Sequence, residues 1–293
     1  MMNTFYSQLR AALSPRYGEA EARAIAFLVM EKAFGVGRTD VYADKVRDFS
    51  EDERLRFRNI CERLEKGEPV QYVLGSAEFA GHDFAVSPAV LIPRPETEEL
   101  VAQAVGTLRQ MRAAGITAPR VLDAGTGSGC IAVSVALACP WAEVEACDLS
   151  EPALQVARAN AAAMQAPVRF FRCDLLAPWP AGSRYHLIVS NPPYICQSEQ
   201  RDMQPHVLDH EPHTALFVPD ADPLRFYRAL ALQAAGGSLC PGGRLAVEIN
   251  RAYGAETAAL LSRSGLCRVQ VLPDSFGNDR MVLADAPEQA LGG

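Results

Sequence analysis

Arg120-Val121-Leu122-Asp123-Ala124-Gly125-Thr126-Gly127-Ser128-Gly129 is the segment from which the architecture of this chain is best predicted. Its first five residues form a short, mainly apolar run that predicts a strand. Three glycines alternate with Thr126 and Ser128 after it, and the apolar run from Cys130 to Ala138 predicts a helix. A glycine-rich turn between a strand and a helix lets a ligand approach the backbone, and the helix N-terminus offers free N–H groups.

An acidic residue follows the glycines at a characteristic distance. The run from Glu143 to Cys147 predicts the next strand, and Asp148 ends it, about 20 positions after the glycines, where a carboxylate binds ribose hydroxyls. The GxGxG pattern lacks the later glycine of dinucleotide sites, which favours a nucleoside without a pyrophosphate. We therefore predict that Gly125 to Gly129 and Asp148 bind a nucleoside cofactor, and that Asp123 faces its amino group. The alternative is a flexible turn between two elements.

Two further strands are predicted to end at the same edge of the sheet. The run from Val168 to Arg172 leads to Asp174 and Leu175, and the run from His186 to Ser190 leads to Asn191. Because the carboxyl ends of parallel strands line the ligand crevice, we expect Asp174 and Leu175 to border the purine of the cofactor. Asn191 is expected to share that edge.

Asn191-Pro192-Pro193-Tyr194 is the second informative segment. Neither proline has a backbone N–H, so the strand cannot continue and the polar Asn191 is left beside a rigid turn. The side-chain oxygen of Asn191 and the carbonyl of Pro192 are two fixed acceptors, which suit an NH2 group. The tetrapeptide therefore favours alkylation of a planar amide or amine nitrogen. The alternative is a strand-ending turn without a chemical role.

Composition excludes several classes of protein. The net charge of −7 over 293 residues argues against a protein that binds bare DNA or RNA by neutralising phosphates. The eight cysteines form no Cys-x-x-Cys pair, so free thiols in a reducing compartment are expected and no metal site is predicted. No run approaches the ~20 apolar residues that span a bilayer, and the N-terminus lacks the apolar core of a signal peptide. A cytoplasmic location is expected.

The chain contains three regions that differ in their predicted secondary structure. Residues 1–70 predict a small helical bundle, with one helix from Ala20 to Phe34 and another that begins at an N-cap at Ser50. Residues 71–94 predict a β-hairpin linker with its turn near Gly81-His82-Asp83. In residues 95–293 helical and strand patterns alternate, which indicates a mostly parallel sheet with crossover helices.

These features resemble the class I S-adenosylmethionine-dependent methyltransferases that act on amino groups, since both glutamine and adenine amino methyltransferases carry Asn-Pro-Pro-Tyr. Further segments resemble the peptide chain release factor N5-glutamine methyltransferase family, in the order of that family and between about residues 65 and 285. These segments are Glu68-Pro69-Val70-Gln71-Tyr72, Phe79-Ala80-Gly81-His82-Asp83-Phe84, Leu91-Ile92-Pro93-Arg94-Pro95-Glu96-Thr97-Glu98, Glu211-Pro212 with Ala215-Leu216, and Gly277-Asn278-Asp279-Arg280.

The resemblance implies a Rossmann-like sheet of seven strands, with antiparallel last strands near 268–272 and 280–284, joined by the hairpin to an N-terminal helical domain that recognises the substrate. It implies methyl transfer from S-adenosylmethionine, which leaves S-adenosylhomocysteine, to the glutamine amide in the Gly-Gly-Gln loop of class 1 release factors. The release factor is then the protein partner, and neither a membrane nor a direct nucleic-acid partner is expected.

The resemblance also implies roles for individual residues. Gly125 to Gly129, Asp148 and Leu175 would bind the cofactor, and Asn191 would contact both the cofactor and the glutamine. Pro192, Pro193 and Tyr194 would complete the glutamine pocket. The remaining matches, Arg94, Glu96 and Thr97, would lie near the mouth of the active site.

The sequence departs from the family at two places, both outside the tetrapeptide. Phe217 to Asp222 replaces a glycine-rich stretch, and Asn250 and Tyr253 replace a glycine and a glutamine after Glu248-Ile249. Three alternatives stay open: a glutamine methyltransferase for a ribosomal protein, a DNA adenine methyltransferase, and a nucleoside-binding module without catalysis.

Overall fold

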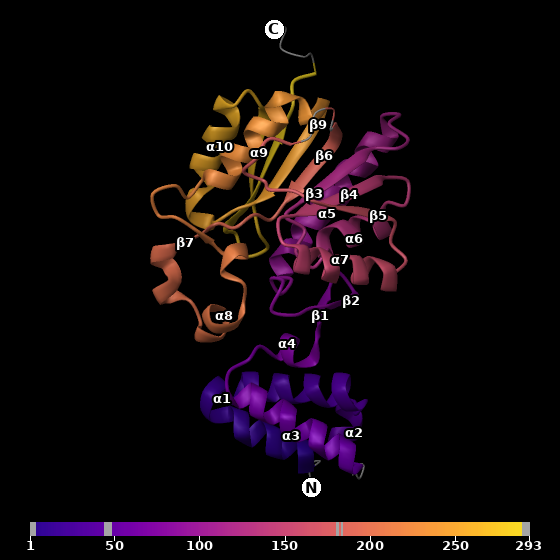
Figure 1. Ribbon diagram of the computed structural model, residues 1–293, viewed down its shortest axis with the longest axis vertical. Helices are drawn as coiled ribbons and strands as arrows, with labels where there is room; N and C mark the ends of the chain where they lie inside the picture. The colour runs from indigo at the N-terminus through magenta and orange to yellow at the C-terminus, as the bar shows by residue number, and fades with distance from the viewer. Residues whose placement is uncertain (1–3, 44–48, 180–181, 183, 289–293) are drawn as a thin grey trace. The chain divides into compact units, whose positions relative to one another are not determined.

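A computed structural model describes residues 4–43, 49–179, 182 and 184–288 of the chain. They divide into two compact units (Figure 1). The helical unit comprises the residues up to Ser76 together with Gln204–His210, and the sheet unit comprises Ala77–Met203 and the residues from Glu211 onward. This division differs from the predicted boundaries at residues 70 and 94, because the chain between them contributes to both units.

The helical unit contains five described helices. These are α1 (Thr4–Phe34), α2 (Arg38–Tyr42), α3 (Glu51–Glu65), α4 (Val70–Leu74) and α8 (Pro205–His210). Apolar side chains of α1 and α3 pack into a common core with Val73 of α4. The helix predicted from residue 20 is therefore the second part of a longer helix, which is interrupted at Gly18 with φ 75°.

The predicted helix ends follow from local chemistry. Ser50 caps α3: its side chain accepts from the Glu53 N–H at 3.2 Å, and the Glu53 carboxylate accepts from the Ser50 N–H at 2.9 Å. This reciprocal pair satisfies two donors that the helix itself leaves free. Gly35 ends α1 with φ 66°, a conformation that an L side chain disfavours.

The prediction of a hairpin from residue 71 onward was wrong at its start. Residues 70–74 form α4, because the Arg63 guanidinium donates to the carbonyls of Tyr72 and Val73 at 3.1 and 3.2 Å and satisfies the end of that helix. The hairpin itself consists of β1 (Ser76–Phe79) and β2 (His82–Ala85). Its turn is Ala80-Gly81, both with positive φ, so the predicted turn residues His82 and Asp83 belong to β2.

The sheet unit is built on a sheet of seven strands in the order β10-β11-β9-β6-β3-β4-β5. Strands β9, β6, β3, β4 and β5 run parallel, and β11 is antiparallel to both β9 and β10. This confirms the predicted fold class, including the antiparallel last strands. The bounds are β3 (Arg120–Ala124), β4 (Glu143–Asp148), β5 (Val168–Arg172), β6 (Tyr185–Ser190), β9 (Leu239–Glu248), β10 (Cys267–Pro273) and β11 (Asp279–Asp285).

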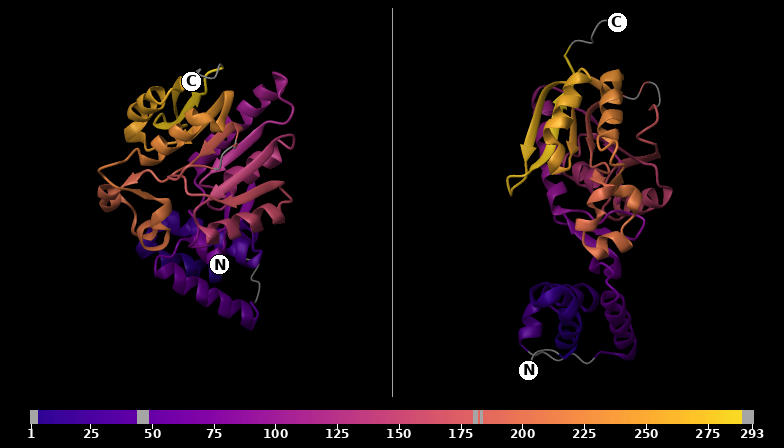
Figure 2. Two further views of the ribbon diagram at one scale, coloured as in Figure 1. Left: turned by 45° about the horizontal axis from the view of Figure 1, so that its top comes forward. Right: turned by 90° about the vertical axis from the view of Figure 1, so that its left-hand side faces the viewer.

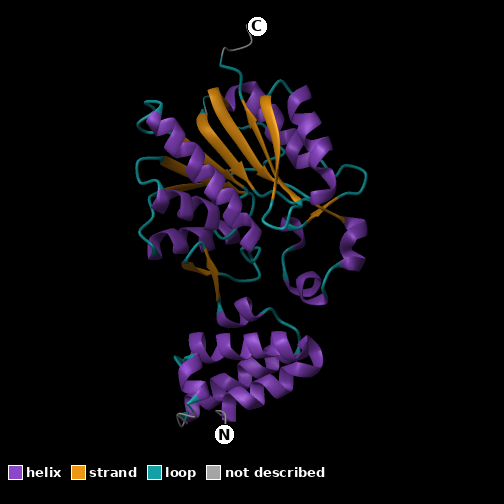
Figure 3. Ribbon diagram, turned by 180° about the vertical axis from the view of Figure 1, so that it is seen from behind, coloured by secondary structure: helices purple, strands orange, loops and turns teal. Residues whose placement is uncertain are grey.

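Helices cover both faces of this sheet, as the right-hand view of Figure 2 and the rear view of Figure 3 show. Val121 packs on one face with α5 (Pro95–Ala113), α6 (Cys130–Ala138) and α7 (Glu151–Ala163). Its neighbour Leu122 packs on the other face with α9 (Arg225–Gln233) and α10 (Gly254–Arg263). Successive strand residues point to opposite faces, so strands covered on both sides are apolar throughout.

Shorter elements lie between the strands and helices of the sheet unit. They are β7 (Ile195–Cys196), η1 (Gln197–Asp202), η2 (His213–Ala215), β8 (Phe217–Val218), η3 (Ala234–Ser238) and η4 (Arg251–Tyr253). All eight cysteines are free thiols. Among the described residues, no helix is both long and apolar enough to cross a membrane.

Candidate active site

The glycine loop lies at the carboxyl end of β3 and is held there by its neighbours. The N–H groups of Gly125 and Thr126 both donate to the carbonyl of Cys147 at the end of β4, at 2.9 Å. Asp123 accepts from the Thr126 hydroxyl at 2.6 Å and from the Ala132 N–H at 3.1 Å. The loop is therefore fixed to the sheet on one side and to α6 on the other.

The prediction that Asp123 faces a ligand was wrong. Its side chain is buried, and burial raises the pKa of this carboxyl group to about 7. Its hydrogen bonds to Thr126 and Ala132 oppose this rise. Asp123 links the strand to the loop and to the first turn of α6, so a carboxylate after an apolar run has a structural role here. Thr126 and Ser128 are also buried, which leaves the backbone of the loop as the surface that a ligand could meet.

Asn160 on α7 supports the other side of the loop. Its side-chain nitrogen donates to the carbonyl of Ser128 at 2.8 Å and to that of Ala85 at 3.0 Å, while its oxygen accepts from the Ala85 N–H at 2.7 Å. One buried side chain thus joins α7, the glycine loop and the end of β2. No local sequence pattern indicated this role for Asn160.

Gly129 is the position in the loop that tolerates a side chain least. Its φ is 83°, and an added Cβ would lie 3.1 Å from the Ala157 Cβ and 3.2 Å from its Cα. We expect Gly129→Ala to lower the free energy of unfolding by about 2 kcal/mol or more, from left-handed strain and overpacking. Gly106→Ala in α5 is the matched control, since nothing lies within 4 Å of its added Cβ. Thermal and urea unfolding measure the stabilities of both variants. A Gly129→Ala variant as stable as Gly106→Ala would contradict the prediction.

Asp148 lies at the end of β4, beside the loop, as predicted. One carboxylate oxygen accepts from the Gly127 N–H and the other from the Ser150 N–H, each at 2.9 Å. These bonds fix the carboxylate in a half-buried position. Its remaining lone pairs can accept hydroxyl donors of a ligand.

The next strand brings Asp174 and Leu175 to the same edge. Asp174 is exposed and accepts from the Leu176 N–H at 2.9 Å, so its carboxylate stays at the surface. Leu175 is buried, with its Cδ1 3.5 Å from where a Cβ of Gly125 would stand. Leu175 is thus the apolar neighbour of the loop, while Asp174 offers charge from the rim.

The segment from Asn191 to Tyr194 begins at the end of β6, the neighbour of β3 in the sheet. The Ser190 hydroxyl donates to the carbonyl of Ala124 at 2.5 Å, which joins the start of the tetrapeptide to the start of the glycine loop. Pro192 is buried, and Asn191, Pro193 and Tyr194 are half-buried. The two predicted motifs therefore lie beside each other at one edge of the sheet.

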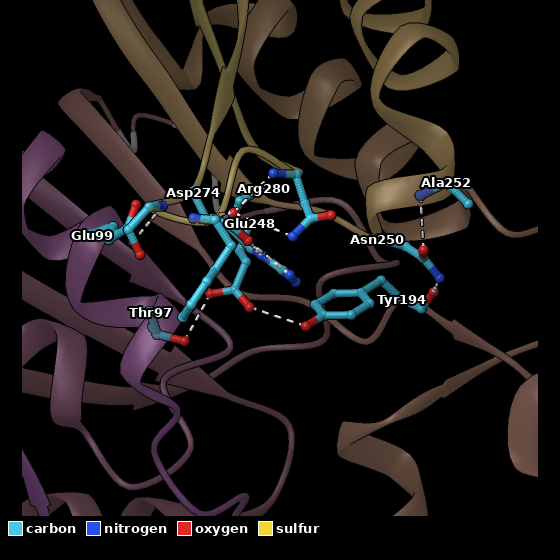
Figure 4. A network of polar contacts seen from close by, with 11 residues as sticks. Thr97, Glu99, Tyr194, Glu248, Asn250, Ala252, Asp274 and Arg280 are labelled. Atoms are coloured by element: carbon cyan, nitrogen blue, oxygen red, sulfur yellow. Dashed lines mark hydrogen bonds and ion pairs between the residues drawn. The ribbon is translucent and has the colours of Figure 1, made fainter. Parts of the chain in front are cut away.

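A buried carboxylate that sequence reasoning missed connects this segment to α5. Glu248, at the end of β9, accepts from the Thr97 hydroxyl at 2.7 Å and from the Tyr194 hydroxyl at 3.0 Å (Figure 4). Thr97 accepts in turn from the Asn191 side-chain nitrogen at 3.1 Å. Only the Glu-Ile pair near the end of a late strand could have drawn attention to Glu248.

Burial raises the pKa of Glu248 above its ordinary value, and the Thr97 and Tyr194 hydroxyls and the charge of Arg280 oppose this rise. Burial also raises the pKa of Tyr194, and the neighbouring Glu248 adds to that effect. Tyr194 is therefore a neutral phenol that donates to Glu248. Its ring is held by this bond at the edge of the site.

The residues at the two departures from the family pattern contact the chain at and after Tyr194. The Asn250 side chain donates to the carbonyl of Tyr194 at 3.3 Å and to the Glu199 carboxylate at 3.0 Å, and it accepts from the Ala252 N–H at 3.0 Å. The segment that begins at Phe217 contributes β8, which pairs with β7 directly after Tyr194. Residues at both departures therefore hold the chain around Tyr194 and β7 in place by hydrogen bonds.

The three residues predicted near the mouth have different roles. Arg94 forms an ion pair with the buried Glu211 at 2.6 Å, which joins the start of α5 to the segment before η2. Glu96 is half-buried in the first turn of α5, and Thr97 is buried and bonded to Asn191 and Glu248. The described residues contain no group of three or more side chains arranged to hold a metal ion.

Comparison with known proteins agrees with this architecture. The family described as Methyltransferase small domain matches residues 104–212, and the PrmC N-terminal domain matches residues 5–75. A release factor glutamine methyltransferase of Bacteroides thetaiotaomicron is 43% identical, over 97% of this chain and 100% of that protein. One from Bordetella pertussis is 42% identical, over 91% and 94% respectively.

A solved structure shares the fold at low sequence identity. The 16S rRNA methyltransferase RsmC of T. thermophilus, in complex with AdoMet and guanosine, is 18% identical over 72% of this chain and 49% of that one, with a TM-score of 0.50. Sheet order, glycine loop and structural likeness together define a class I methyltransferase. The identity to full-length relatives goes further: the chain belongs to the release factor glutamine methyltransferase family.

Proposed function

We propose that this protein transfers a methyl group from S-adenosylmethionine to the side-chain amide nitrogen of the glutamine in the Gly-Gly-Gln loop of class 1 release factors. The observation that carries the proposal is the placement of Asn191 and Pro192 at the end of β6, joined by Ser190 to the glycine loop at the end of β3. A methyl donor on the loop would then lie beside an amide on the tetrapeptide.

The residues around the glycine loop fit the nucleoside of the cofactor. The loop offers backbone, because its side chains are absent or buried. Asp148, fixed by two N–H donors, would accept the ribose hydroxyls, and the buried Leu175 beside Gly125 would provide an apolar edge for the purine. We assign Gly125 to Gly129, Asp148, Asp174 and Leu175 to this site.

The cofactor would supply an electrophilic methyl group. The amide nitrogen of glutamine is a poor nucleophile, because its lone pair is delocalised into the carbonyl. The task of the protein is therefore to align the nitrogen with the methyl group at near-attack distance. The Asn191 side-chain oxygen and the Pro192 carbonyl would accept the two amide hydrogens and stabilise the positive charge that develops on nitrogen.

No dedicated base is needed before transfer in this proposal, since the methylated amide cation is acidic enough to lose its proton afterwards. Tyr194 is committed to Glu248 through its hydroxyl. It contributes its ring face to the pocket, as does Pro193, while Arg94 and Glu96 border the mouth. Translation factors act in the cytoplasm, which is accordingly the location that we propose.

The helical unit is proposed to recognise the release factor, because the sheet unit already accounts for cofactor and chemistry. Deletion of residues 1–65 is expected to spare cofactor binding and to abolish turnover on the intact release factor. Isothermal titration with S-adenosylmethionine and methyl transfer to the purified factor are the measurements. Retained cofactor affinity shows that the truncated protein is folded. Unimpaired methylation of the intact factor would overturn this assignment.

Transfer of labelled methyl from S-adenosylmethionine to three purified acceptors tests the proposed function. The acceptors are a class 1 release factor, ribosomal proteins and duplex DNA. Label in the release factor alone is expected. Label in a ribosomal protein or in DNA instead would overturn the substrate assignment and retain the methyltransferase, whereas no label in any acceptor would contradict the proposal as a whole.

A further inference from the structure

In the chain of hydrogen bonds behind Asn191, each bond has a defined donor and acceptor. Glu248 is 1% exposed, and each of its carboxylate oxygens accepts from one hydroxyl group, Thr97 at 2.7 Å and Tyr194 at 3.0 Å. An ionised carboxylate has no donor, so both hydroxyl hydrogens must point toward it. The hydrogen of Thr97 is therefore committed to Glu248.

This commitment determines what Thr97 can offer to Asn191. With its only hydrogen given to Glu248, the Thr97 oxygen can act only as an acceptor. It selects the NH2 end of the Asn191 carboxamide, which donates to it at 3.1 Å. Because the two ends of a carboxamide point in different directions, the oxygen of Asn191 is turned away from Thr97.

We propose that Thr97 and Glu248 are positioning residues that fix which end of the Asn191 carboxamide faces the reacting amide. The inference rests on the proposed function and deepens it: the site takes a nitrogen that donates hydrogens, because Asn191 is held with its acceptor available. Thr97 thus acts on the substrate through Asn191, whereas the family resemblance implied only a place near the mouth of the active site. A reversed Asn191 would present two donors to the substrate NH2 group.

Neighbouring groups raise or lower the pKa of Glu248 and so affect its ionisation. Burial and Glu96 of α5 raise its pKa, whereas Thr97, Tyr194 and Arg280 of β11 lower it. Arg280 is itself held by Asp274, with nitrogen–oxygen distances of 3.1 and 3.2 Å. Among the described residues, the phenol of Tyr227 and the thiol of Cys130 also interact with the Glu248 charge.

The hydrogen bonds from Asn191 to Thr97 and from Thr97 to Glu248 form a relay. This relay depends on pH in one direction. Protonation of Glu248 adds a donor and frees the Thr97 hydrogen to face the Asn191 oxygen. We expect kcat to fall as the pH decreases through the raised pKa of Glu248. In a variant without the Thr97 hydroxyl this acid limb should be smaller, because the hydrogen-bonded link from Glu248 to Asn191 is then broken and the bond to Tyr194 remains.

The matched pair Thr97→Val and Thr97→Ser tests the proposal. Valine keeps the shape and removes the hydroxyl, while serine keeps the hydroxyl. We expect Thr97→Val to lower kcat for release factor methylation ~10-fold, with KM for S-adenosylmethionine unchanged, and Thr97→Ser to restore most of the rate. Thermal melting of both variants identifies any loss due to unfolding. Equal kcat values for Thr97→Val and the wild type would overturn the proposal.

A double-mutant cycle separates positioning from a general structural effect. If Thr97 acts through Asn191, the variant with Thr97→Val and Asn191→Ala should be no slower than Asn191→Ala alone. Multiplicative losses would show that Thr97 acts by another route and would overturn the relay.

An activity-independent readout distinguishes failure of the relay from failure of the proposed function. In NMR spectra, the Asn191 side-chain NH2 signals, assigned by their loss in Asn191→Ala, should exchange with solvent more slowly in the wild type and in Thr97→Ser than in Thr97→Val. If the wild type fails to methylate the release factor but shows this exchange pattern, the proposed substrate is overturned and the relay is supported. Equal exchange in all three proteins would overturn the relay regardless of activity.

Discussion

Asn191→Ala is expected to lower the rate of methyl transfer to the release factor by at least ~10-fold and to leave affinity for S-adenosylmethionine nearly unchanged. The side chain supplies one of two acceptors for the substrate amide, and its oxygen is preorganised by the bond from its nitrogen to Thr97 at 3.1 Å. Losing a preorganised group affects the transition state more than the ground state. Single-turnover methylation with saturating cofactor measures the effect on the chemical step.

Gln155→Ala is the matched control for this variant. It removes a carboxamide from an exposed position on α7, so both its stability and its turnover should equal those of the wild type. Isothermal titration of the Asn191 variant with S-adenosylmethionine should give a dissociation constant near that of the wild type. Near-normal turnover of Asn191→Ala would show that the Asn191 side chain does not hold the substrate amide.

Asp148→Ala is expected to weaken binding of S-adenosylmethionine by ~10- to 100-fold, the range for loss of a charged hydrogen-bond acceptor. Two effects add in this variant. The ribose loses its carboxylate partner, and the Gly127 N–H loses the acceptor that holds it at 2.9 Å, which loosens the glycine loop. Titration of the purified variant with the cofactor measures the affinity directly.

Glu78→Ala is a suitable control, since it removes an exposed carboxylate from β1. At saturating cofactor the Asp148 variant should recover much of its turnover, because Asp148 does not touch the reacting amide. An unchanged dissociation constant would show that the ribose binds elsewhere.

The strand–loop–helix unit was predictable from sequence because its signals are local. The observed bounds of β3, α6 and β5 agree with the predicted ones residue by residue, since apolar runs and glycines determine them within a short window. The N-cap at Ser50 was found for the same reason. The two motifs could be placed together because parallel strands present their carboxyl ends to one edge.

The supports of the site could not be predicted, because they join residues far apart in the chain. Glu248 meets Thr97 across 151 positions, and Asn160 meets Ala85 across 75. A carboxylate at a strand end looks the same in sequence whether it binds a ligand, like the proposed role of Asp148, or is buried against its own loop, like Asp123. Only packing distinguishes the two cases, which is why Asp123 was assigned wrongly and Glu248 was missed.

The most direct test of the central claim is methyl transfer from labelled S-adenosylmethionine to a class 1 release factor and to the same factor with a Gln→Ala change in its Gly-Gly-Gln loop. We expect label in the unchanged factor, located by mass spectrometry on the side-chain amide of that glutamine, and none in the changed factor. Equal label in both factors, or label on any other residue, would contradict this claim.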